Sequence, residues 1–197
     1  MTTAKAEKEL QKAYETLAIY LILSIEARDP YKKGHSERVK LYCRKIAQKM
    51  NLPSKKIQAL ERVASLHDIG KIAIPDAILY KPGRLTTSEF VQLQAHPDRS
   101  FELVRMIPNP QDTLLAIRHH HERMDGKGYP LGLAGNSIPL LARILAVADS
   151  YDALCSDRPY RKAFTHDEAT QILRNNSGIQ WDPDVVEAAI EAFSTDK

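Results

Sequence analysis

The sequence predicts an all-α fold. Apolar residues recur at helical spacing along most of the 197-residue chain, helix-start signals occur at intervals, and no run shows sustained strand alternation. The length suits one domain, or one domain with an added segment. A hydrophobic content of 43% and a charged content of 27% are ordinary for a globular protein with a substantial core.

The first predicted helix spans residues 5–28, and its first half is rich in charged residues. This half fits a solvated helix and equally the end of a coiled linker from a domain outside this sequence, so both remain open. The apolar positions share one face and are Leu10, Ala13 or Tyr14, Leu17, Leu21 and Ser24-Ile25.

Later helices are marked by apolar spacing and by capping residues. The spacing predicts helices over 39–50 and over 57–66, the second entered through Pro53-Ser54, and a buried helix over the apolar segment 139–155. Four further helix starts are predicted by capping boxes and by N-cap residues that precede proline: Thr86 with Glu89, Thr165 with Glu168, Asn109-Pro110 and Asp182-Pro183.

A glycine-rich segment over 125–139 interrupts this helical pattern, with its first turn at Asp125-Gly126 expected to end the preceding helix. A loop this long inside a compact domain is usually functional or mobile. We predict a structured loop because it has side chains to pack with, namely Tyr129, Leu131, Leu133 and Ile138.

Charge and cysteine content limit the function classes. A net charge of +3 is too small to indicate binding to a nucleic-acid polymer. Cys43 and Cys155 lie far apart in the sequence, which fits a reducing compartment better than a disulfide scaffold. The longest apolar run, residues 17–25, is too short to span a membrane, and the first residues lack a signal-peptide core. We expect a cytoplasmic protein without membrane insertion.

Histidine and aspartate occur in pairs that suggest metal chemistry. Three of the seven histidines are consecutive, at 119–121, and His67 is followed directly by Asp68. Adjacent helical residues point about 100° apart, so such a pair faces one target only if the target is wide or lies at a helix end. Two neighbouring metal ions are wide. Asp149 also lies inside an apolar helix, where an unpaired carboxylate is costly and a cation would stabilise it.

Six motifs follow one another along the chain: HDIGK at 67–71 with IPD after it, KPGRLT at 81–86, HP at 96–97, HHERMDGKGYP at 120–130, IPLLARILAVADSYDAL at 138–154 and SDRPYRKA at 156–163. Taken together, these motifs resemble the HD-GYP family, phosphodiesterases of the HD superfamily that hydrolyse cyclic di-GMP. The resemblance runs from about Ala27 to the C-terminus, which divides the chain into a helix over 1–26, a coiled linker or dimerisation segment, and an HD-GYP domain over 27–197. It implies the HD-superfamily helical bundle with a glycine-rich GYP loop.

The resemblance implies a metal centre in which Asp68 bridges two ions and His119 is only a neighbour. Some family members hold a third ion with a glutamate four residues before the first ligand histidine. Tyr31 stands there in this sequence, and tyrosine is a poor ligand, so we predict two ions. Imidazole and carboxylate ligands without thiolate suit iron or manganese better than structural zinc. The implied ligands are His35, His67, Asp68, His96, His120, His121 and Asp149.

The resemblance also implies a reaction, the hydrolysis of cyclic di-GMP to pGpG, with continuation to GMP left open. A water bridging two cations would lose a proton readily and attack the phosphorus in line as hydroxide. Asp68 and Lys71 are the implied catalytic residues; Lys71 would contact the scissile phosphate and share the helix face of His67 if that helix continues.

Substrate contacts are implied near the loop and along the segment after it, where arginine suits bidentate binding of phosphate or guanine. Asp152 could instead support a metal ligand, Arg143 could be a structural ion-pair donor, and Tyr129 could be a structural buttress. Asp125 could support the His120-His121 pair. The predicted substrate contacts are Lys71, Tyr129, Arg143, Asp152, Arg158, Arg161 and Lys162.

Partners implied by the resemblance are diguanylate cyclase (GGDEF) domains at the GYP loop. We also expect a homodimer through the N-terminal helix, and packing of this helix on the catalytic bundle remains open. Two other functions remain open. One is a catalytically weak module that binds cyclic di-GMP and other proteins. The other is a phosphodiesterase for a related cyclic dinucleotide, such as cyclic GMP-AMP.

Overall fold

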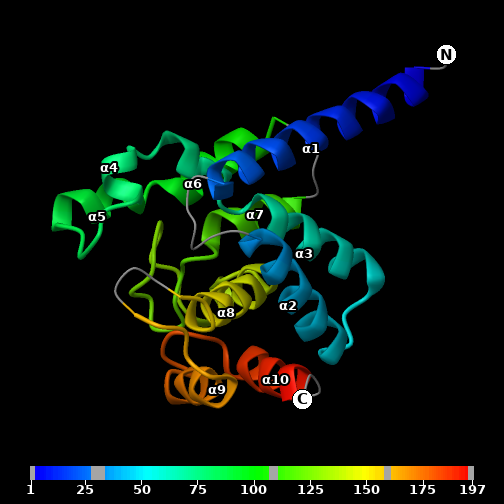
Figure 1. Ribbon diagram of the computed structural model, residues 1–197. Helices are drawn as coiled ribbons and strands as arrows, with labels where there is room; N and C mark the ends of the chain where they lie inside the picture. The colour runs from blue at the N-terminus through cyan, green and yellow to red at the C-terminus, as the bar shows by residue number, and fades with distance from the viewer. Residues whose placement is uncertain (1–2, 28–33, 107–110, 158–160, 195–197) are drawn as a thin grey trace.

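A computed structural model describes residues 3–27, 34–106, 111–157 and 161–194 of the chain. Within these ranges no strand forms, which confirms the all-α prediction. The described residues form ten α-helices and two short 3-10 helices (Figure 1). They are α1 (Thr3–Ala27), α2 (His35–Lys49), α3 (Ser54–Leu66), η1 (Ile69–Ala73), α4 (Asp76–Leu79), α5 (Thr87–Leu93), α6 (His96–Val104), α7 (Gln111–His119), η2 (Gly135–Ser137), α8 (Leu140–Leu154), α9 (His166–Asn175) and α10 (Pro183–Phe193).

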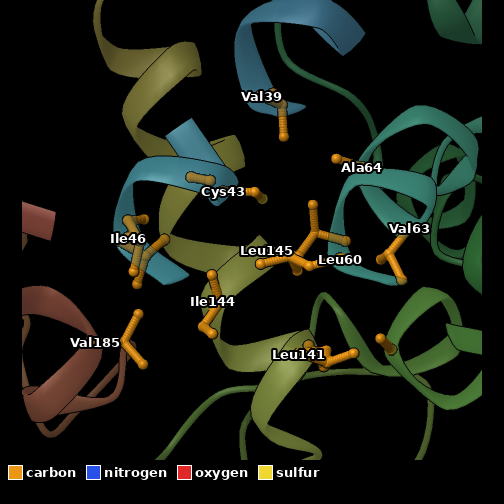
Figure 2. Close-up of a cluster of buried hydrophobic side chains, with 14 of the residues drawn as sticks. Val39, Cys43, Ile46, Leu60, Val63, Ala64, Leu141, Ile144, Leu145 and Val185 are labelled. Atoms are coloured by element: carbon orange, nitrogen blue, oxygen red, sulfur yellow. The ribbon is translucent and has the colours of Figure 1, made fainter. Parts of the chain in front are cut away.

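The core is built around α8, the apolar helix predicted over 139–155. It contacts α2, α3, α7, α9 and α10. Figure 2 shows Ile144 and Leu145 of α8 beside Ile46 and Leu60, all of them fully buried. Full burial of an aliphatic side chain of this size stabilises the fold by about 1.5–3 kcal/mol relative to exposure. This packing therefore fixes the helices whose ends carry the candidate site.

Most predicted helix starts are confirmed. Both capping boxes form, at Thr86 and Thr165, and Asp182 accepts hydrogen bonds from the backbone N–H groups of Asp184 and Val185. The Asn109-Pro110 start lies outside the described residues. No helix among those described is both long enough and apolar enough to cross a membrane.

The apolar face that the spacing marks on α1 is largely exposed. Leu10 and Leu17 are 55% and 57% exposed, whereas Ala18 and Ile22 are each only 4% exposed. α1 carries two apolar stripes, and the bundle covers only one of them, where α1 packs on α3 and η1. The N-terminal half of α1 extends away from the bundle (Figure 1).

α3 ends where the sequence predicts, whereas α7 ends earlier than predicted. α3 ends at Leu66, so Lys71 lies in η1 and does not share a continuous α-helix with His67. α7 ends at His119, several residues before the turn at Asp125-Gly126. The adjacent pairs His67-Asp68 and His120-His121 therefore lie at helix ends, which relaxes the 100° restriction that a continuous helix would impose.

Candidate metal centre

The residues predicted as metal ligands meet at one place because helix ends converge there. His35 begins α2, His96 begins α6, His67-Asp68 follows α3, His120-His121 follows α7, and Asp149 lies within α8. In each of three overlapping groups, the candidate ligand atoms lie within 4.8 Å of one another. The groups are His35, His67 and Asp149; His67, Asp68 and His120; and His96, His120 and His121.

Three of these histidines are oriented in the same way, each by the backbone carbonyl three residues before it. The Nδ1 atoms of His67, His96 and His120 lie 2.9, 2.8 and 2.6 Å from the carbonyl oxygens of Ala64, Leu93 and Ile117. A carbonyl oxygen only accepts hydrogen bonds, so Nδ1 carries the hydrogen and Nε2 presents a lone pair. The same local device thus turns three ring nitrogens toward the centre as potential ligands.

The inward nitrogens fit a cation. Nε2 of His67 and of His120 is buried and has no hydrogen-bond partner within the described part of the chain, which is rare for a polar atom. Nε2 of His121 lies 3.2 Å from Nε2 of His96, whose lone pair points into the same space. A metal ion would use these lone pairs.

Burial also sets the protonation state of these rings. It lowers the pKa of His67, lowers those of His96 and His121 well below the usual value, and lowers that of His120 to about 4. The rings are therefore neutral near pH 7, and neutral imidazole is the form that binds a metal.

The Asp68 carboxylate lies between the groups. Its Oδ1 is 3.4 Å from Nε2 of His96 and 3.6 Å from Nε2 of His67, and its Oδ2 is 4.0 Å from Nε2 of His35. The two oxygens thus face different histidines. Nζ of Lys71 lies 2.6 Å from Oδ2, so the lysine reaches the centre from η1.

On the α2 side, His35 lies between two aspartates of α8. Its Nε2 is 3.3 Å from Oδ1 of Asp149, and its Nδ1 is 2.7 Å from Oδ2 of Asp152. Burial alone would raise the pKa of Asp149, but the hydrogen bond and charge of His35 outweigh it, and the pKa lies well below its usual range. Arg38 donates to Asp152 at 2.6 Å. Asp152 therefore orients His35, as carboxylates commonly orient metal-binding histidines.

The loop over 125–139 is folded against the histidine pair, as predicted for a structured loop. The N–H of Tyr129 donates to the His121 carbonyl at 3.2 Å, and the Tyr129 ring stacks on the His121 ring at 4.8 Å between centroids. A Cβ on Gly128 would lie 2.5 Å from Cα of Glu122, so only glycine fits there.

Two buried polar residues that support the centre were not predicted. Both carboxylate oxygens of Glu122 accept backbone N–H groups of the loop, from Leu131 at 2.8 Å and Leu133 at 3.0 Å. Ser100 accepts from the N–H of Gly70 at 2.9 Å and donates to the carbonyl of His67 at 2.6 Å. The position of Glu122, directly after the two histidines, was the sequence signal that could have indicated its role. No comparable signal in the sequence marked Ser100.

The expected support from Asp125 is not observed. Its carboxylate instead pairs with Arg123, at 3.0 and 2.8 Å, and accepts the N–H of Lys127 at 3.1 Å. The Arg123 guanidinium lowers the pKa of Asp125 to about 2. Asp125 therefore closes the turn rather than holding the histidine pair.

A cavity of about 390 Å³ opens beside the centre, between the loop and α8. Its lining includes His121 and Asp149 from the centre, Tyr129 and Lys127 from the loop, and Trp181. Burial raises the pKa of the Tyr129 hydroxyl, which therefore stays protonated and able to donate. A ligand in this cavity would reach the ring nitrogens directly.

Three of the cationic residues predicted as substrate contacts have other partners. Arg143 forms an ion pair with Asp182, the N-cap residue of α10, and donates to Asn136. Arg161 donates to the carbonyl of Ala153 at 2.8 Å. Lys162 is exposed and lies 3.3 Å from Asp157. Arg158 and Tyr31 lie outside the described residues.

Comparison with known proteins places this arrangement in a family. The family model described as HD domain matches residues 20–185. The chain therefore belongs to the HD domain family. Its relatives that are named cyclic di-GMP phosphodiesterases confirm the expected assignment to the HD-GYP group within that family.

Curated relatives and solved structures agree with this assignment. The chain is 43% identical, over 91% of its length, to the cyclic di-GMP phosphodiesterase response regulator RpfG of Xanthomonas campestris, and covers 48% of that protein. It is 38% identical, over 97% of its length, to 3'3'-cGAMP-specific phosphodiesterase 3 of Vibrio cholerae, and covers 42% of it. The chain thus spans about half the length of the curated relatives it matches.

Among solved structures, the HDGYP protein Bd1817 of Bdellovibrio bacteriovorus superposes with a TM-score of 0.68 at 19% identity, over 96% of this chain and 64% of that one. The cyclic GMP-AMP phosphodiesterase V-cGAP3 of Vibrio cholerae gives a TM-score of 0.56 at 31% identity, over 98% of this chain and 42% of that one. The first likeness concerns the fold alone.

Proposed function

We propose that this chain is a metal-dependent phosphodiesterase that hydrolyses cyclic di-GMP to pGpG, with further hydrolysis to GMP left to experiment. The observation that carries this proposal is the cluster of buried, neutral histidines whose Nε2 atoms face one another around the Asp68 carboxylate. The curated relatives named cyclic di-GMP phosphodiesterases support the choice of substrate.

The proposed cofactors are two divalent ions, iron or manganese. One is assigned to His35, His67 and Asp149, and the other to His96, His120 and His121, with Asp68 shared between them. When bound, such a pair lowers the pKa of a water and offsets the charge that develops on a phosphoryl oxygen. Imidazole and carboxylate ligands suit these metals.

The chain's own residues would then bind and orient the substrate. Lys71 is proposed to contact the scissile phosphate and to assist the leaving oxygen, because its Nζ lies 2.6 Å from Oδ2 of Asp68. Tyr129, which lines the cavity and keeps its proton, is proposed to contact the substrate. Arg158 is kept as a proposed contact, and so is Lys162, because its ion pair with Asp157 is exposed to solvent. Structural roles are proposed for Arg143, Asp152 and Arg161, whose side chains are held by less exposed protein partners.

A second candidate substrate is cyclic GMP-AMP. Two of the Vibrio cholerae proteins named as specific for 3'3'-cGAMP are 38% and 34% identical to this chain over more than nine-tenths of its length. The two metal ions and the attacked phosphate would be the same for both dinucleotides. Only the contacts to one base would differ.

For partners, a homodimer through α1 and contact of the GYP loop with GGDEF domains are proposed. The exposed stripe on α1 supports the first, because Leu10, Tyr14, Leu17 and Leu21 recur at the alternating spacing of four and three residues that pairs helices. The exposed Leu131 in the loop supports the second. The division into a segment over 1–26 and a domain over 27–197 is likewise proposed.

A substrate panel tests the proposal. Protein loaded anaerobically with Fe²⁺ or with Mn²⁺ is incubated with cyclic di-GMP, 3'3'-cGAMP and cyclic di-AMP, and the products are separated by chromatography. We expect cyclic di-GMP to yield pGpG fastest. Faster turnover of 3'3'-cGAMP would select the second candidate, and tight binding of cyclic di-GMP without turnover by both loaded forms would indicate a binding module instead.

A further inference from the structure

The start of α2 lacks a capping side chain of its own. Its N-cap residue is Gly34, in the left-handed conformation at φ 70°, and no side chain there accepts a hydrogen bond. The first N–H groups of a helix need an acceptor from elsewhere. His35, the first residue of α2, belongs to the proposed metal centre, so the anchoring of this turn bears directly on that centre.

The missing acceptor comes from α1. Oε1 of Glu26 accepts the backbone N–H of Ser36 at 2.7 Å and the Ser36 hydroxyl at 2.5 Å. Glu26 is only 6% exposed, and so is Ser36. A carboxylate at a helix N-terminus is stabilised by the N–H groups and by the helix dipole, and a charge-assisted bond of this kind is stronger than a neutral one.

His35 is consequently held from two sides. Asp152 of α8 fixes its ring through Nδ1 at 2.7 Å, and Glu26 of α1 fixes the backbone of the next residue. The side-chain bond alone would leave the first turn of α2 free to fray, because helix ends depend on such caps.

We propose that Glu26 is a positioning residue for His35, and that it holds in place one of the two metal positions, the one shared by His35, His67 and Asp149. The other position takes its ligands from the start of α6 and from the end of α7, so it does not depend on the first turn of α2. This inference rests on the proposed metal centre, but not on the identity of the substrate.

The consequence is an asymmetry between the two positions. Removing the Glu26 carboxylate weakens binding of the ion at the His35 position. It leaves binding unchanged at the position formed by His96, His120 and His121. Loss of a group that orients a metal ligand typically costs about 10–100-fold in affinity. α1 also carries the exposed stripe proposed for dimerisation, so Glu26 links that helix physically to the centre.

The test is a titration of the whole chain with Mn²⁺, with free Mn²⁺ followed by electron paramagnetic resonance. For wild type we expect two bound ions. For Glu26→Ala we expect one ion to bind with wild-type affinity and the other to bind at least about tenfold more weakly. Glu26→Gln keeps an acceptor oxygen, so its affinity for the second ion should lie between those of wild type and Glu26→Ala.

Ile22→Ala is the matched control. Ile22 lies one turn earlier on the same buried stripe, is 4% exposed, and leaves the cap of α2 in place. It should lower the melting temperature while retaining two Mn²⁺ ions. Hydrogen exchange at the start of α2 gives a readout without metal: the Ser36 amide should exchange faster in Glu26→Ala, but not in Ile22→Ala.

The inference would be overturned if Glu26→Ala lost affinity equally at both positions, or if it bound two Mn²⁺ ions with wild-type affinity. If Glu26→Ala does not fold, the same criteria apply to Glu26→Gln. Two Mn²⁺ ions bound by Glu26→Gln with wild-type affinity would also overturn the inference. A wild-type chain that binds two Mn²⁺ ions but hydrolyses no cyclic dinucleotide would refute the proposed function and leave the role of Glu26 standing.

Discussion

The metal centre and the segment from Arg143 to Lys162 were predicted from the same family motifs, yet they differ in the structure. In the centre, buried ring nitrogens face one another, and those of His67 and His120 have no hydrogen-bond partner among the described residues. In the segment, Arg143 and Arg161 already bond to protein groups. Nε of Arg143 is also buried without a hydrogen-bond partner among the described residues, but its NH1 nitrogen is bound by Asp182 and Asn136. The difference teaches that a ligand site brings several polar atoms together around one space, whereas the arginines direct their terminal nitrogens to protein groups.

The largest expected effect is at the centre itself. Asp68→Ala should lower hydrolysis by several orders of magnitude and lower the metal content, because the shared carboxylate is lost. Activity assays and metal analysis of the purified variant measure both. Asp112→Ala removes the same group from a surface ion pair with Lys56, which is worth about 0–1 kcal/mol, and should behave as wild type. Unchanged metal content in Asp68→Ala would contradict the assigned role.

Adjacent histidines sharpen the comparison within one motif. His120→Ala removes a nitrogen that faces the centre, and Mn²⁺ affinity should fall by more than the 10–100-fold typical of a supporting group. His119→Ala should reduce affinity less than about tenfold, since its Nδ1 lies 3.6 Å from Glu122 and the ring belongs to none of the ligand groups. Equal losses in the two variants would show that the motif is aligned wrongly.

Removing the ions should expose a pH dependence of stability. Burial lowers the pKa of His120 from 6.5 to about 4, so between these values the unfolded chain binds a proton that the folded chain does not. With a chelator present, the free energy of unfolding should therefore fall as the pH drops from about 6.5 to about 4, by on the order of 3 kcal/mol from His120 alone. Urea titrations at several pH values measure this. A free energy of unfolding that does not change with pH in the metal-free protein would contradict this prediction.

The smallest effect is expected in the arginine segment. Arg143→Gln leaves the Asp182 carboxylate, 4% exposed, without its cationic partner, which should destabilise the fold by about 1–3 kcal/mol. KM for cyclic di-GMP should change little. A tenfold rise in KM with unchanged stability would instead make Arg143 a substrate contact and would break the distinction between the two regions.

Local patterns explain what could be predicted from the sequence. Capping boxes at Thr86 and Thr165 involve neighbours three residues apart, and they formed as expected. The centre was predicted because its family motifs mark each ligand, even though spacing alone does not bring His35 to Asp149.

What the sequence left open or missed depended on distant partners. The choice between the two stripes of α1 depends on which one α3 and η1 cover. Arg143 pairs with Asp182, 39 residues away, and Asp152 pairs with His35, 117 residues away. The early end of α7 at His119 likewise reflects the Glu122 contacts that draw the loop against the helix end. No local pattern encodes these contacts.

The most direct measurement is crystallography of the manganese-loaded chain with anomalous scattering at the manganese edge. We expect two ions, one among His35, His67 and Asp149 and one among His96, His120 and His121, with Asp68 between them. A single ion, or ions bound elsewhere on the chain, would contradict the two-metal centre on which the proposed hydrolysis depends.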